Sequence, residues 1–90
     1  VQKFSLSQNY PNPFNPKTTI GFSLATTGNV TLKIYNTLGQ KIATLLQNEK
    51  MDAGKHEVQF DGSTIASGIY FYRLSINEKL TAVKKLVIMK

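Results

Sequence analysis

Hydrophobic residues in this chain alternate with polar ones over short stretches, and turn residues interrupt them about every dozen positions. The clearest stretch covers residues 30–35, where Val30, Leu32 and Ile34 occupy every second position. A period of two places such residues on one face of a strand, whereas an amphipathic helix needs a period of 3.6. No stretch has the helical period, so the sequence predicts an all-β protein.

About seven strands follow from this pattern, near residues 4–8, 19–24, 30–35, 41–47, 56–60, 69–76 and 80–89. Alternation slips within the fourth segment, which predicts a β-bulge, and residues 48–54 are expected to form a polar loop. The segment at 69–76 starts apolar on both faces, which predicts a strand covered on both sides. Seven strands in a domain of this size fit an immunoglobulin-like antiparallel β-sandwich. Its expected core includes Phe22, Leu32, Ile34, Val58, Phe60, Tyr70 and Leu74.

Prolines at positions 11, 13 and 16 define a separate segment before the second strand. Proline lacks the backbone N–H that a helix needs, and it pushes the preceding residue into extended geometry. We therefore expect a rigid extended loop, with Tyr10 and Phe14 as its apolar anchors.

Ninety residues allow one domain, and the start at Val1 is expected to be an internal boundary of a longer protein. The net charge of +6 raises nucleic acid as a partner. Two features argue against it. Arg73 is the one arginine, and the excess charge collects near the C-terminus, at Lys79, Lys84, Lys85 and Lys90. We expect no nucleic-acid partner.

Residues for catalysis or metal binding are scarce. The one histidine, His56, shares strand parity with Val58 and Phe60, which favours a structural role. One histidine without cysteine cannot form a zinc site. Asp61 begins a faint calcium-loop pattern without the further carboxylates, so we expect it to cap a turn. The sequence therefore predicts neither an enzyme nor a bound cofactor or metal.

Aromatic residues leave one alternative open. Those at positions 35, 60, 70, 71 and 72 could line a platform for a carbohydrate or a nucleic acid, although aromatics on strands are more often core. On this alternative the chain is an accessory immunoglobulin-like module of a secreted hydrolase, which binds a glycan or another protein or serves a structural role.

Five segments together resemble the C-terminal sorting domain of the Por (type IX) secretion system. Residues 6–20 (LSQNYPNPFNPKTTI) resemble its opening, and residues 30–40 (VTLKIYNTLGQ) its second block. Residues 54–62 and 67–74 resemble the third and fourth blocks. Residues 84–88 (KKLVI) resemble its basic-then-apolar terminus. A similar domain occurs in flagellar hook-capping proteins, so a hook-capping-like immunoglobulin fold is also implied.

The resemblance implies a function as well as a fold. Residues 1–90 would be a single C-terminal sorting domain, covalently joined to an N-terminal carrier that reaches the periplasm first. The type IX machinery would then export the carrier to the cell surface or beyond, where a surface sortase cleaves the domain. The determinants carried over from the family are Gly68, Tyr70, Lys84, Lys85, Leu86, Val87 and Ile88.

The terminal strand motivates a more specific hypothesis. An apolar strand at a sheet edge offers unpaired backbone groups to a partner, either a receptor strand or a second copy in a dimer. On this basis residues 86–90 are expected to contribute more to export than to folding, so that their deletion leaves a folded sandwich.

Overall fold

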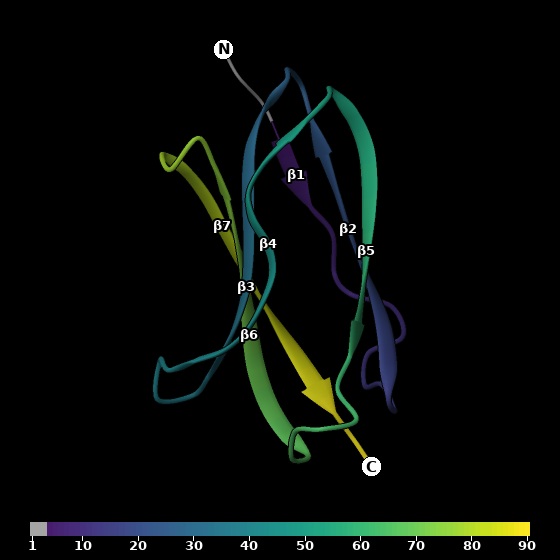
Figure 1. Cartoon of the computed structure of the whole chain (residues 1–90). Helices are drawn as coiled ribbons and strands as arrows, with labels where there is room; N and C mark the ends of the chain where they lie inside the picture. Colours follow the sequence, from purple (N-terminus) through teal and green to yellow (C-terminus); the bar gives the residue numbers. More distant parts are fainter. Residues whose placement is uncertain (1–3) are drawn as a thin grey trace.

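The computed structural model describes residues 4–90, which contain seven strands and no helix (Figure 1). The strands are β1 (Phe4–Leu6), β2 (Lys17–Leu24), β3 (Gly28–Asn36), β4 (Lys41–Met51), β5 (Gly54–Asp61), β6 (Gly68–Ile76) and β7 (Leu80–Ile88). All the strand pairs are antiparallel. The predicted all-β sandwich is confirmed.

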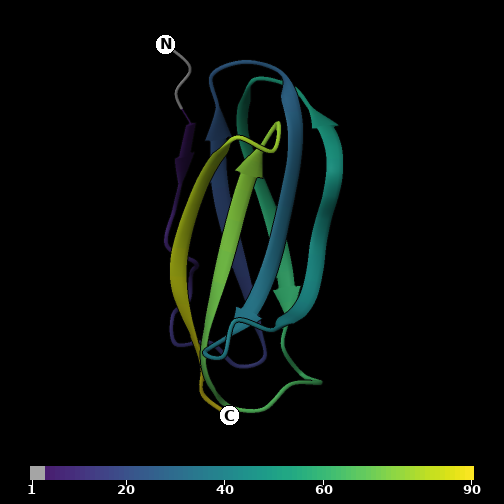
Figure 2. The ribbon, with the colours of Figure 1, turned by 90° about the vertical axis from the view of Figure 1, so that its left-hand side faces the viewer.

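Two sheets form the layers of the sandwich. One has the strand order β1-β2-β5 and the other the order β4-β3-β6-β7. Figure 2 faces the four-stranded sheet, with the terminal strand β7 at one edge and β4 at the other. The chain crosses between layers after β2, β4 and β5, so strands that are neighbours in sequence often lie in different sheets.

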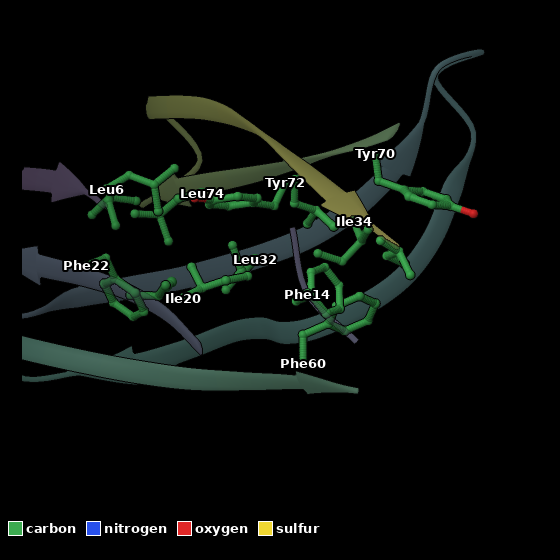
Figure 3. Packing of buried hydrophobic residues seen from close by; sticks show 14 of the residues in the cluster. Leu6, Phe14, Ile20, Phe22, Leu32, Ile34, Phe60, Tyr70, Tyr72 and Leu74 are labelled. Atoms are coloured by element: carbon green, nitrogen blue, oxygen red, sulfur yellow. The ribbon is translucent and has the colours of Figure 1, made fainter. Parts of the chain in front are cut away.

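The core lies between the inner faces of the sheets, as the alternation predicts (Figure 3). Leu32 and Ile34 of β3 are fully buried, and so is Ile20 of β2 in the facing sheet. Every predicted core residue lies in this layer, although Val58 is only half-buried.

Strand β4 is longer than predicted. The expected loop at 48–54 is wrong, because its first half continues the ladder with β3: Glu49 pairs with Val30, and Met51 with Gly28. These positions lie at the sheet edge and are mostly solvent-exposed, so they carry no apolar alternation that reveals a strand. The predicted irregularity is confirmed, since the register shifts three times between β3 and β4.

Within residues 4–90, other parts of the chain cover only one face of β6, so the prediction of cover on both faces is wrong. Tyr70, Tyr72 and Leu74 point into the core. On the other face Ile69 is 46% exposed and Phe71 is half-buried. The apolar start of this strand therefore marks an open outer surface rather than a second buried layer.

The proline loop has one apolar anchor instead of two. Phe14 is buried and packs its ring edge against Phe60, with ring centroids 6.0 Å apart. Tyr10 is 81% exposed, so its predicted anchoring role is wrong. Its backbone pairs with Thr19, which lies on the outer face of β2, and paired residues project to the same side of a sheet.

A buried polar network fixes the start of this loop to β6. The Tyr72 hydroxyl accepts a hydrogen bond from the Asn9 backbone N–H at 2.9 Å and donates one to the Ser7 carbonyl at 2.6 Å. The Asn9 amide donates to the Thr18 hydroxyl and to the Pro11 carbonyl. These bonds satisfy the polar groups that the loop brings inside, which would otherwise destabilise the fold.

Burial raises the pKa of Tyr72 to about 12, from an ordinary value of 10.0. Because the folded state holds this proton more tightly than the unfolded state, its contribution to stability is present below pH 10. It is lost as the pH rises through about 12. We expect the difference in phenolate absorbance between the wild type and Tyr72→Phe to show one tyrosine titrating near pH 12. A difference curve centred near pH 10 would contradict the buried network.

Candidate functional site

All seven residues expected from the sequence lie on one pair of adjacent strands, β6 and β7. Gly68 is opposite Ile88, and Tyr70 is opposite Leu86. The register also places Val87 opposite Ile69, Lys85 opposite Phe71 and Lys84 opposite Tyr72. Two sequence blocks separated by more than ten residues therefore form five consecutive rungs of one ladder.

Three of the seven side chains face the core. Leu86 is 0% exposed, and Ile88 and Tyr70 are also buried. The Tyr70 ring lies at the rim of the core (Figure 3). Its hydroxyl donates a hydrogen bond to the Ala66 carbonyl at 2.8 Å. These side chains can shape a recognition surface, but in the folded domain they are not available for contact with a partner.

The other four reach the surface to different degrees. Lys85 is exposed and Val87 half-buried on the outer face, whereas Lys84 has the inward parity and is half-buried. Gly68 begins β6 with a φ of +148°, a backbone conformation that residues with a Cβ rarely adopt. No heavy atom would lie within 4 Å of a Cβ at this position, so backbone conformation rather than crowding favours glycine there.

The free edge of β7 is partly covered, which corrects the hypothesis of an unpaired terminal strand. The loop of residues 8–14 runs along the C-terminal half of this edge (Figure 2). Phe14 exchanges backbone hydrogen bonds with Val87 and Met89, each at 3.0 Å. Asn12 accepts from the Val87 N–H, and the Gln8 amide donates to the Lys85 carbonyl. Strand addition is therefore restricted to the first half of β7.

His56 has the structural position that its parity predicts. It is half-buried and stacks on Phe22, with ring centroids 5.4 Å apart. Its Nε2 lies 2.7 Å from the Asp52 carbonyl oxygen. The turn-capping role of Asp61 is also confirmed, because its carboxylate accepts from the Ser63 N–H at 2.9 Å. That hydrogen bond is the main cause that lowers the pKa of Asp61.

Within residues 4–90, no three His, Cys, Asp or Glu side chains are grouped so that they could hold a metal ion. The same part of the chain contains no helix with the length and apolar character needed to span a membrane.

The aromatic residues divide between core and surface. Phe60, Tyr70 and Tyr72 are core residues, which confirms the structural interpretation for them. Tyr35 and Phe71 are half-buried on the outer face of the four-stranded sheet, where they are cross-strand partners.

The chain matches a family of secretion system C-terminal sorting domains over residues 8–89. Since this match covers most of its length, the chain belongs to that family. It is a C-terminal sorting signal of type IX secretion, which serves export to the cell surface or beyond. A sorting domain of this kind is not itself catalytic.

Solved structures share the fold. Dimeric latent PorU from Porphyromonas gingivalis matches 99% of this chain with a TM-score of 0.75 at 21% identity. The chain spans only 10% of that PorU chain. CopC from Methylosinus trichosporium matches 96% of this chain and 93% of its own, with a TM-score of 0.60 at 9% identity. Similarities at these identities establish the fold alone. A comparison with curated protein sequences gave no match.

Proposed function

We propose that residues 1–90 form the single C-terminal domain of a larger exported protein and direct that carrier across the outer membrane. The observation that carries this proposal is the family match over residues 8–89, which includes both the proline segment and the terminal strand. The carrier first enters the periplasm through its own N-terminal signal. The type IX machinery then recognises the folded domain, and a surface sortase removes it.

The seven expected residues take two roles in this proposal. Tyr70, Leu86 and Ile88 act from the core by holding β6 and β7 in register. The accessible residues Lys85 and Val87 contact the machinery, together with Gly68 and Lys84 at the margins of the strand pair. Any enzymatic activity of the whole protein belongs to the carrier, because the domain serves as a sorting signal. An accessory glycan-binding role is not favoured, since the family match assigns sorting to nearly the whole chain.

A fusion tests the function. Residues 1–90 are joined to the C-terminus of a periplasmic reporter and expressed in a bacterium that has type IX secretion. The reporter is expected outside the outer membrane, and its mass should fall by about that of the domain, 10.0 kDa, if the sortase cleaves it. Retention of the intact fusion in the periplasm would contradict the proposal, whereas export at full mass would contradict only the cleavage step.

A further inference from the structure

The outer face of the four-stranded sheet combines aromatic, aliphatic and cationic side chains. One cross-strand row contains Tyr35, Phe71 and Lys85, and the next contains Lys33, Arg73 and Val83. Lys41 lies beside Tyr35 on β4 and extends the first row. This face is turned toward the viewer in Figure 2.

The apolar part of this face is accessible. Val83 is 56% exposed, and Ile69 stands opposite Val87 at one end of the face. Tyr35, Phe71 and Val83 line a shallow hollow of about 320 Å³, and Arg73 forms part of its wall. An apolar hollow bordered by cations is typical of a protein interface, in which apolar anchors lie at the centre and charges at the rim.

The charges on this face oppose folding. Lys33 and Arg73 are direct cross-strand partners, and like charges in such positions are destabilising. The outward positions of β3, β6 and β7 contain no Asp or Glu. Glu78, in the turn after β6, lines a hollow with Lys33 and Arg73 at one end of the face. The single carboxylate of Glu78 leaves most of this positive charge uncompensated. A partner with several carboxylates would therefore reduce the repulsion among these cations.

The opposite sheet has a different character. The outward positions of β2 carry mainly Ser, Thr and Gly, and those of β5 carry Lys55, Glu57, Gln59 and Asp61, so that acids accompany the one lysine of β5. Ser5 and Ser23 share a hydrogen bond at 2.6 Å across this face. The combination of exposed apolar side chains with several cations is therefore a feature of the four-stranded sheet.

We propose that the outer face of the four-stranded sheet docks an acidic protein surface, with an apolar side chain of that partner seated in the hollow beside Phe71. This inference rests on the proposed function, because the partner is assigned to the export machinery. A second copy of this chain does not fit, since it would bring the same four cations against Lys33, Lys41, Arg73 and Lys85. Nucleic acid fits less well, because Ile69 and Val83 present aliphatic surface on which bases do not stack.

Two charge-reversal variants distinguish an effect on docking from an effect on folding. Lys33→Glu places opposite charges across β3 and β6, so the melting temperature is expected to rise by roughly 1–5 °C. Lys55→Glu makes the same change in net charge on the other sheet, opposite Ser23, and serves as the matched control. A loss of binding in a variant that melts higher cannot be attributed to misfolding.

Binding is measured by NMR, with isotope-labelled domain titrated with a soluble peptide that alternates glutamate and leucine. The shifted amides should lie in residues 31–35, 69–75 and 83–87. Lys33→Glu should weaken binding by at least about tenfold, and Lys55→Glu by less than about twofold. Shifts on β2 and β5, or equal effects of the two variants, would overturn the proposal. The proposal would also be overturned if oligothymidylate or polygalacturonate bound to this face more tightly than the acidic peptide.

An export assay tests whether this face takes part in sorting. A reporter fusion with Lys33→Glu should remain in the periplasm while the Lys55→Glu fusion reaches the surface. Equal export of the two would show that this face has no role in sorting and would overturn the assignment of its partner. Failure of the wild-type fusion to leave the periplasm would instead count against the sorting function, and the peptide titration would still decide whether the face binds an acidic protein.

Discussion

Deletion of residues 86–90 is expected to unfold the domain. The deletion removes Leu86 and Ile88 from the core, and truncation of one such buried side chain to alanine costs about 2–5 kcal/mol. Domains of this size are stable by only about 5–15 kcal/mol, and the deletion also removes the backbone partners of Phe14. Far-ultraviolet circular dichroism should therefore show an unfolded chain at 25 °C and no cooperative melting transition on heating.

The matched control for this deletion keeps the segment and changes its charge. Lys84→Glu with Lys85→Glu leaves Leu86 and Ile88 in place, so the double variant should melt within a few degrees of the wild type. A truncated chain that still melts like the wild type would contradict the structure. It would support the sequence-based hypothesis that the terminal segment matters more for export than for folding.

Phe14→Ala is expected to have the second-largest effect, a loss of about 3–5 kcal/mol in the free energy of unfolding. The ring is 2% exposed and packs against Phe60, while its backbone pairs with the end of β7. Loss of this anchor should release the loop from the terminal strand. Hydrogen exchange at the amides of Val87 and Met89, which donate to Asn12 and Phe14, should then accelerate.

Tyr10→Ala is the control from the same loop. Tyr10 is exposed, so the change should alter the unfolding free energy by less than about 0.5 kcal/mol and leave exchange at Val87 unchanged. If both variants lose the same stability, the loop is not anchored through Phe14.

Alternation in the sequence predicted the core strands because most of their inward positions are apolar. Leu32 and Ile34 are examples, and both are fully buried. The same signal misses the end of β4, where edge residues such as Glu49 are exposed. It also cannot distinguish an apolar face that another layer covers from one that is left open, as at Ile69 and Phe71 of β6.

The sequence, through its family resemblance, could name candidate residues, but it could not predict how their side chains are arranged. Period two in the terminal run already separates Leu86 and Ile88 from Val87, yet it does not say which set points inward. The strands β6 and β7 form a hairpin across the short turn at residues 77–79, and the geometry of that turn, rather than the apolar pattern, sets the register that places Gly68 opposite Ile88. The cover over the β7 edge depends on backbone atoms of a distant loop, for which the sequence has no pattern.

We propose that a folded sandwich presents its sorting signal on the paired strands β6 and β7. The most direct measurement is the surface-exposed fraction of a reporter fused to the Lys84→Glu, Lys85→Glu domain, compared with Lys17→Glu, Lys55→Glu on the other sheet. Both double variants change the net charge equally, and both should remain folded. The account predicts that the first fusion stays in the periplasm while the second is exported like the wild type. Export of both at the wild-type level would contradict it.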